Sequence, residues 1–212
     1  MLSYSRGPDA PLIDASIWDV FETTADRFSE REALVARHQG ARLTFSGLAA
    51  IVERTARGLT GLGIGPNDRV GVWSTNCVEW VQMHLACARI GAVLVNVNPA
   101  YRSYELAFVL RKSRMKALFL WERDKRSNYR AILDEAIGAQ TLALQRAVYF
   151  ETDGWHEMLS RGRDIPRQRI SADAVTNIQY TSGTTGSPKG VLLTHRNILN
   201  NAAVLAEGMR IT

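Results

Sequence analysis

The sequence predicts an α/β protein whose mainly parallel β-sheet is covered by helices on both faces. Short, continuous apolar runs alternate along the chain with longer amphipathic segments, and strands that are buried on both faces have this character. The chain has 212 residues, of which 46% are hydrophobic and 22% charged. It is therefore long enough for one large α/β domain or two small ones, and too apolar to be disordered as a whole.

Local signals predict each element in order. A helix begins after Ser16, with Asp19 placed for a capping box, and a short hairpin over residues 33–45 turns at Gln39-Gly40. Further helices are predicted over residues 46–59, 77–90, 104–114, 126–137, 155–160 and 198–209. Strands are predicted over residues 69–74, 92–97, 117–121, 146–151 and 174–180. Parallel sheets of this kind bind ligands in the crevice at the carboxyl ends of their strands.

Some signals concern helix ends and connectors. Ser103 is expected to cap the helix over 104–114, and the polar segment 162–173 is expected to be an exposed connector. Four glycines, Gly58, Gly61, Gly63 and Gly65, follow or end the second helix. Their spacing does not match a dinucleotide fingerprint, and they follow a helix instead of a strand, so we interpret them as a helix C-cap and turn.

Composition excludes several classes of protein. The most apolar region, residues 70–97, is interrupted by charged and polar side chains, whereas a membrane span needs about 20 mainly apolar residues. The first residues contain no apolar signal region. We therefore expect no membrane span and a cytoplasmic location. The sequence gives no indication of an oligomeric state.

The cysteines, tryptophans and one histidine are interpreted as parts of the core. Cys77 and Cys87 lie about 15 Å apart along one predicted helix, too far for a disulfide, and no Cys or His spacing indicates zinc. Ser182 and His195 do not form a hydrolase pair, because the G-x-S-x-G elbow is missing. His195 is expected to fix the geometry of a strand-to-helix junction. Structural roles are also expected for Trp73, Trp80 and Trp121.

The net charge is +5, and only four of the 26 basic residues are lysines. The densest basic run, residues 111–130, also contains Glu122 and Asp124. We interpret it as a solvated face that favours anionic small molecules, and we expect no nucleic-acid partner.

The most informative segment is a loop rich in glycine and hydroxyl side chains, residues 180–190. It reads Tyr-Thr-Ser-Gly-Thr-Thr-Gly-Ser-Pro-Lys-Gly. Glycines let backbone amides approach an anion, hydroxyls add donors, and Lys189 adds a mobile positive charge. This composition is typical of a polyphosphate cradle. It is not a Walker A loop, because Lys189 is followed by a β-like run instead of a helix.

The order of residues in this loop resembles the signature of the adenylate-forming (AMP-binding) superfamily, which includes acyl- and aryl-CoA ligases. Every fixed position of that signature is matched, with Ser187 in the free slot. Weaker resemblances occur at residues 43–48, at 88–99 and at 193–197. The resemblance implies the N-terminal part of the large α/β domain of an acyl-CoA synthetase, and residues 1–212 cover less than half of a typical member.

The resemblance also implies a two-step reaction that uses ATP, Mg²⁺ and CoA. A carboxylic acid, expected to be a medium- or long-chain fatty acid, forms an acyl-adenylate and pyrophosphate, and the thiol of CoA then takes the acyl group and releases AMP. The implied ATP-binding residues are Thr181, Ser182, Gly183, Thr184, Thr185, Gly186 and Lys189. The main catalytic residues and the ligands of Mg²⁺ are expected beyond Thr212, so residues 1–212 alone are expected to be inactive. The alternatives are an aryl-CoA ligase fragment and a stand-alone nucleotide- or anion-binding module without catalysis.

Overall fold

The computed structural model describes residues 11–138, 143–166, 168–181 and 188–210. The helices are α1 (Ile17–Arg27), α2 (Phe45–Gly61), α3 (Val78–Ile90), α4 (Ser103–Ser113), α5 (Tyr129–Ile137), α6 (Asp153–Ser160) and α7 (His195–Gly208), with a short 3-10 helix, η1 (Arg37–Gln39). The strands are β1 (Glu32–Ala36), β2 (Ala41–Thr44), β3 (Arg69–Trp73), β4 (Val93–Val97), β5 (Ala117–Leu120), β6 (Arg146–Tyr149), β7 (Val175–Thr181) and β8 (Lys189–Thr194).

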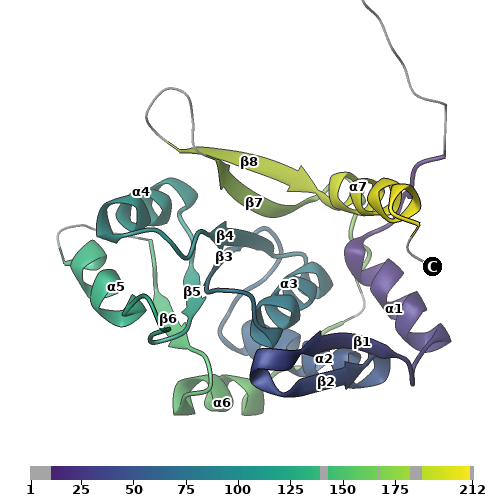
Figure 1. The fold of residues 1–212 in the computed structure, drawn as a ribbon, viewed down its shortest axis with the longest axis horizontal. Coiled ribbons are helices and arrows are strands. Elements are labelled where there is room, and N and C mark those ends of the chain that lie inside the picture. The colour runs from purple at the N-terminus through teal and green to yellow at the C-terminus, as the bar shows by residue number, and fades with distance from the viewer. Residues whose placement is uncertain (1–10, 139–142, 167, 182–187, 211–212) are drawn as a thin grey trace, which may run out of the picture.

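The main sheet has six strands in the order β6-β5-β3-β4-β7-β8 (Figure 1). The first five run parallel, and β8 returns antiparallel to β7. β1 and β2 form a separate antiparallel hairpin. The mainly parallel α/β sheet that the sequence predicts is therefore confirmed.

Both faces of the main sheet carry a core. Along β5, Ala117 and Phe119 face a core that contains side chains from α1, α2, α3 and α6, whereas Leu118 and Leu120 face a core that contains side chains from α4 and α5. Figure 1 shows α4 and α5 on one side of the sheet and α2 and α3 on the other. All four of these β5 side chains are buried, which explains why the strand reads as a continuous apolar run.

Several helix starts differ from the prediction. The last helix begins at His195 instead of residue 198, because the Thr194 hydroxyl accepts the Asn197 amide and caps it there. Arg102 and not Ser103 occupies the N-cap of α4, and the Glu105 carboxylate accepts a hydrogen bond from the Arg102 amide at 3.1 Å. The fifth helix begins at Tyr129 instead of 126. The reason is that the Asp124 carboxylate accepts hydrogen bonds from the amides of Arg126 and Ser127, which holds them in a turn.

The glycines at the end of α2 serve two purposes. The helix continues through Gly61, past its predicted end at residue 59. A Cβ on Gly58 would lie 2.7 Å from the carbonyl oxygen of Met158 in α6, so this glycine permits a close helix contact. Gly63 has a φ of +78° and makes the predicted turn, since glycine adopts such angles without strain.

The expected core residues are buried to different degrees. Trp73 is fully buried and donates a hydrogen bond from Nε1 to the carbonyl oxygen of Asn98 at 3.0 Å. Trp80 and Trp121 are partly buried against the cores. Cys77 and Cys87 are both buried and free, and burial raises the pKa of the Cys87 thiol to about 12. Their interpretation as core residues is confirmed.

Candidate functional site

The glycine-rich loop joins β7 to β8 at one edge of the main sheet. β7 ends at Thr181 and β8 begins at Lys189. Because β7 runs parallel to β4, its carboxyl end lies at the same edge as the carboxyl ends of β3, β4 and β5. The loop therefore leaves the sheet at the edge where α/β proteins of this type bind their ligands.

Two of the seven predicted site residues lie among the described residues. Thr181 and Lys189 are directly opposite each other in the antiparallel pair, and both are exposed. Side chains of directly opposite residues lie on the same face of a sheet, so the hydroxyl and the ammonium group share one face at the mouth of the loop. Ser182, Gly183, Thr184, Thr185 and Gly186 lie outside the described residues.

The start of the loop is anchored by Tyr180. Its ring packs against the core on the α4–α5 side, and burial raises the pKa of its hydroxyl. Its partner across the hairpin is Gly190. A Cβ on Gly190 would touch the Tyr180 ring and Ile178 at 3.4 Å, so the glycine leaves room for the ring to lie across β8.

No helix begins at the lysine. Lys189 is the first residue of β8, and α7 begins six residues later at His195. Because β8 runs antiparallel to β7, the amino end of α7 lies at the opposite edge of the sheet from the loop. The Thr194 hydroxyl and the Asn197 side chain cap it in a reciprocal box. The prediction that a β-like run and not a helix follows Lys189 is confirmed.

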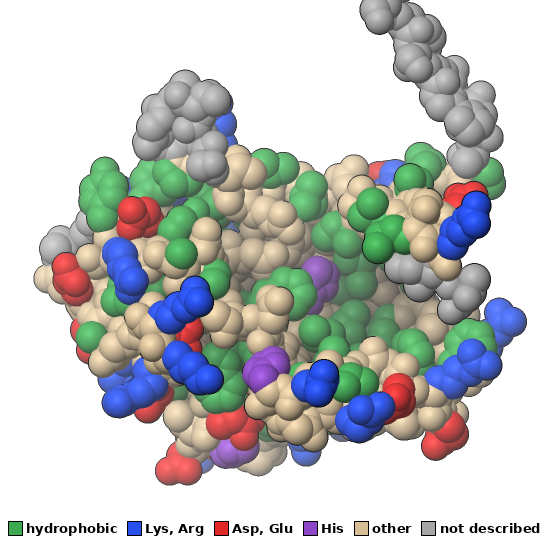
Figure 2. Space-filling model, viewed as in Figure 1, with side chains coloured by type: hydrophobic (Ala, Val, Ile, Leu, Met, Phe, Trp, Pro, Cys, Tyr) green, Lys and Arg blue, Asp and Glu red, His purple; other side chains and the backbone are tan. Residues whose placement is uncertain are grey.

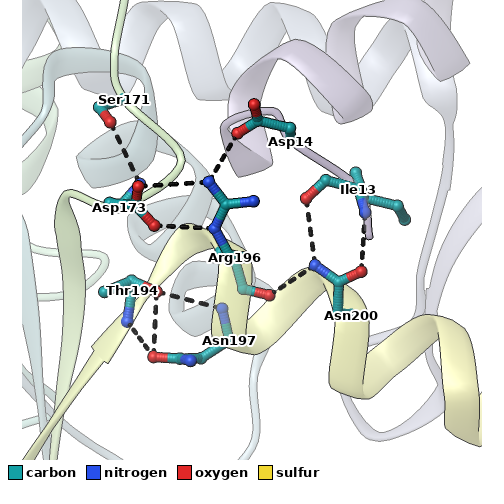
Figure 3. Close-up of polar contacts among 8 residues, drawn as sticks. All are labelled: Ile13, Asp14, Ser171, Asp173, Thr194, Arg196, Asn197 and Asn200. Atoms are coloured by element: carbon teal, nitrogen blue, oxygen red, sulfur yellow. Dashed lines mark hydrogen bonds and ion pairs between the residues drawn. The ribbon is translucent and has the colours of Figure 1, made fainter. Parts of the chain in front are cut away.

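A polar network fastens the base of the β7–β8 hairpin (Figure 3). The Arg196 guanidinium donates to both carboxylate oxygens of Asp173, from Nε at 2.8 Å and from Nη2 at 3.2 Å. Hydrogen bonding to Arg196 lowers the pKa of the Asp173 carboxyl. Sequence reasoning missed this network, because the contacts of Arg196 with Asp173 and of Asn200 with Ile13 join residues far apart in the sequence.

His195 lies in this junction and not beside the loop. Its side chain is 1% exposed, and its Nδ1 accepts a hydrogen bond from the Ile17 amide at 3.1 Å. Burial, together with the neighbouring His84, lowers the pKa of His195 to about 4. The imidazole is therefore neutral near pH 7 and serves the strand-to-helix junction, as the sequence predicts.

The described residues contain no group of three or more His, Cys, Asp or Glu side chains that could hold a metal ion. Nor is any helix among the described residues both long and apolar enough to cross a membrane.

Comparison with known proteins places this site in a family. The family model of the AMP-binding enzymes matches residues 21–211. The medium-chain acyl-CoA ligase ACSF2 of Homo sapiens mitochondria is 37% identical over 99% of this chain and 38% of its own length. The chain therefore spans about two fifths of the length of this curated relative.

Solved structures of acyl-CoA synthetases share this fold. A fatty acyl-CoA synthetase of Mycobacterium tuberculosis superposes with a TM-score of 0.80 at 28% identity, over 91% of this chain and 37% of that one. A long-chain fatty-acid–CoA ligase, FadD1 of Archaeoglobus fulgidus, gives a TM-score of 0.82 at 26% identity, over 100% of this chain and 43% of that one. With the family match over residues 21–211, these similarities show that the chain belongs to the AMP-binding enzyme family.

Proposed function

We propose that residues 1–212 form the N-terminal portion of the large domain of an ATP-dependent acyl-CoA synthetase. The observation that carries the proposal is the placement of the signature loop. The loop joins Thr181 to Lys189 at the edge of the sheet where the parallel strands have their carboxyl ends. These two residues are directly opposite each other in the β7–β8 pair, and both side chains are exposed. That placement exposes donors for the phosphates of ATP where ligands bind in this type of fold.

The proposed chemistry has two steps. A carboxylate attacks the α-phosphate of ATP and expels pyrophosphate, which gives an acyl-adenylate; the thiol of CoA then takes the acyl group and AMP leaves. Negative charge grows on the departing pyrophosphate in the first step, so donors held in place beside it lower the barrier. The proposed donors are Thr181, Ser182, Gly183, Thr184, Thr185, Gly186 and Lys189.

The remaining parts of the machinery lie outside this chain in the proposal. Mg²⁺ would neutralise phosphate charge during the first step, and the proposal assigns its ligands to residues beyond Thr212. The principal catalytic residues are assigned to the same part of the full-length protein. We accordingly expect residues 1–212 alone to release no AMP from ATP.

A medium- or long-chain fatty acid is the proposed substrate. The human relative is named as a medium-chain acyl-CoA ligase, and the Archaeoglobus structure as a long-chain fatty-acid–CoA ligase. Both names describe acids with a flexible alkyl chain. An aryl acid remains the second candidate at the level of substrate, because an anthranilate–CoA ligase shares the fold, with a TM-score of 0.75 at 20% identity.

The test is AMP release by the full-length protein with a panel of carboxylic acids. The panel contains saturated fatty acids from butyrate to stearate together with benzoate and anthranilate, each with ATP, Mg²⁺ and CoA. We expect AMP release that depends on a fatty acid and peaks at a medium or long chain. A peak at the aryl acids would contradict the substrate, and no acid-dependent AMP release with any compound would contradict the proposed function.

The cytoplasmic location also remains a proposal. Fractionation of the native host checks it, and recovery of the protein in an organelle or a membrane fraction would contradict it.

A further inference from the structure

Helix α7, which follows the phosphate loop and β8, buries little apolar surface. Of its residues, all described, His195 alone is buried. Val204 and Leu205 are 69% and 53% exposed. Figure 2 shows apolar side chains on the surface over α7 and a hollow between this helix and the β1–β2 hairpin. Ile198 and Leu199, near the start of the helix, pack partly buried against the core, so apolar packing among the described residues fixes the first turns of α7 but not its second half.

Polar contacts with the N-terminal strap, defined here as residues 13–17, also hold α7. The Asn200 side chain accepts a hydrogen bond from the Ile13 amide at 2.8 Å and donates one to the Ile13 carbonyl oxygen at 3.1 Å. The Ile17 amide donates to Nδ1 of His195. These bonds join residues 178 to 187 positions apart, and Figure 3 shows Asn200 turned toward Ile13.

Arg196 joins the strap to the stem of the hairpin. Its Nη2 donates to the Asp14 carboxylate at 2.8 Å, while the same guanidinium holds both oxygens of Asp173 just before β7. The Arg196 backbone amide also donates to the carbonyl oxygen of Ala172 at 2.8 Å. One side chain thus ties together the strap, the start of β7 and the start of α7.

The hairpin depends on this tie because β8 is the outermost strand on one side of the main sheet. Among the described strands, β8 pairs only with β7, and Val191 and Leu192 of β8 are exposed. The end of β8 away from the loop runs directly into α7. Two contacts therefore set the orientation of β8 and of Lys189 at its beginning. β7 pairs with β8 along its length, and the strap holds α7, which follows the last residue of β8.

We propose that Asn200 and Arg196 are positioning residues for ATP: by fastening α7 to the strap they hold β8, and with it Lys189, in the orientation that binds the phosphates. The inference rests on the proposed function. If the tie is lost, the hairpin samples orientations that cannot bind ATP, and the apparent dissociation constant rises in inverse proportion to the fraction that remains competent. Once ATP is bound the orientation is restored, so kcat is little affected.

The decisive comparison is Asn200→Ala with Asn201→Ala in the full-length enzyme. Asn201 is the exposed next residue on the same helix, so its variant controls for the loss of an asparagine from α7. We expect Asn200→Ala to raise the KM for ATP about 3- to 10-fold, the loss of roughly one hydrogen-bonded pair, with kcat nearly unchanged. Amide hydrogen exchange should accelerate together in the strap and in α7. Asn201→Ala should change neither quantity.

A second pair of variants separates positioning from general loss of structure. Arg196→Lys keeps a positive charge near Asp173 and Asp14 but loses the forked geometry, so it should recover part of the ATP affinity that Arg196→Ala loses. Faster exchange in Asn200→Ala with an unchanged KM for ATP would overturn the proposal, and so would equal KM values in the two asparagine variants. A wild-type enzyme that releases no AMP would instead contradict the proposed function itself.

Discussion

The imidazole of His195 shows how burial decides the role of a single residue. A histidine that follows a loop rich in serine and threonine suggests acid–base chemistry. Its Nδ1 accepts the Ile17 amide in a buried site, and burial together with His84 lowers its pKa to about 4. His84 is also neutral near pH 7, because burial lowers its pKa to about 4 as well. Both side chains thus contribute to stability in their neutral forms.

The first prediction is that the protein loses stability as the pH falls from about 6.5 to about 4. In this window the unfolded chain binds a proton at His195, whose ordinary pKa is about 6.5, and the folded chain does not. The free energy of unfolding should therefore decrease as the pH decreases, by at most about 1.4 kcal/mol per pH unit for this residue. Urea unfolding between pH 4 and 7 measures the slope.

The matched variant for this prediction is His195→Asn. Asparagine does not titrate and keeps an oxygen that can accept the Ile17 amide, so the pH dependence should become shallower than in the wild type. An identical slope in the two proteins would mean that His195 does not contribute to it.

Among the elements, the contact between α2 and α6 depends on a residue without a side chain. The Gly58 backbone approaches α6 so closely that a Cβ would lie 2.7 Å from the Met158 carbonyl oxygen. A backbone oxygen cannot move aside as the end of a side chain can. Gly58, which the spacing of the glycines assigns to a helix C-cap and turn, is therefore a helix-packing residue.

The second prediction follows for Gly58→Ala. Alanine favours the helix by up to about 1 kcal/mol, but overpacking against a backbone costs about 1–3 kcal/mol. We expect the free energy of unfolding to decrease by about 1–2 kcal/mol, measured by urea unfolding. Gly65→Ala is the control, because nothing lies within 4 Å of its added Cβ. If Gly58→Ala proves as stable as the control, the close contact is not as tight as described.

The sequence predicts most helices and strands. It does not predict the side chains from distant parts of the chain that fix where an element begins or ends. Continuous apolar runs such as β5 predict buried strands because both of their faces meet cores. The start of α3 shows what such patterns miss. The Gln39 side chain, nearly forty residues earlier, accepts the Val78 amide at 2.8 Å, and its Nε2 lies 2.9 Å from a carboxylate oxygen of Glu79. No local spacing indicates that contact.

At the scale of the whole molecule, alternation of strands and helices predicts a parallel sheet but not the order of its strands. The connection from β4 crosses β3 to reach β5, and the chain later returns to place β7 beside β4. That return brings the signature loop to the edge where β3, β4 and β5 end. The loop residues are recognisable from the sequence, whereas the contacts between the strap and α7 depend on tertiary structure alone.

The distribution of charge agrees with the interpretation of residues 111–130 as a solvated surface. The acidic residues of this run have local partners: Glu122 pairs with Arg130, and Asp124 accepts the hydroxyl of Tyr129 at 2.7 Å. Figure 2 shows Lys and Arg side chains spread over this face among acidic ones. Such a surface adds a general attraction for anionic substrates.

The central claim is that Lys189 and its loop bind the phosphates of ATP. The measurement that tests it most directly is fatty-acid-dependent AMP release by the full-length enzyme, compared between the wild type and Lys189→Ala. Loss of a charged hydrogen bond of about 1.5–3 kcal/mol predicts a decrease of roughly 10- to 100-fold in kcat/KM for ATP, with an unchanged melting temperature. Lys112→Ala, which removes an exposed lysine from α4, should leave both values unchanged. Normal AMP release by Lys189→Ala, or a lower melting temperature with normal specific activity, would contradict the account.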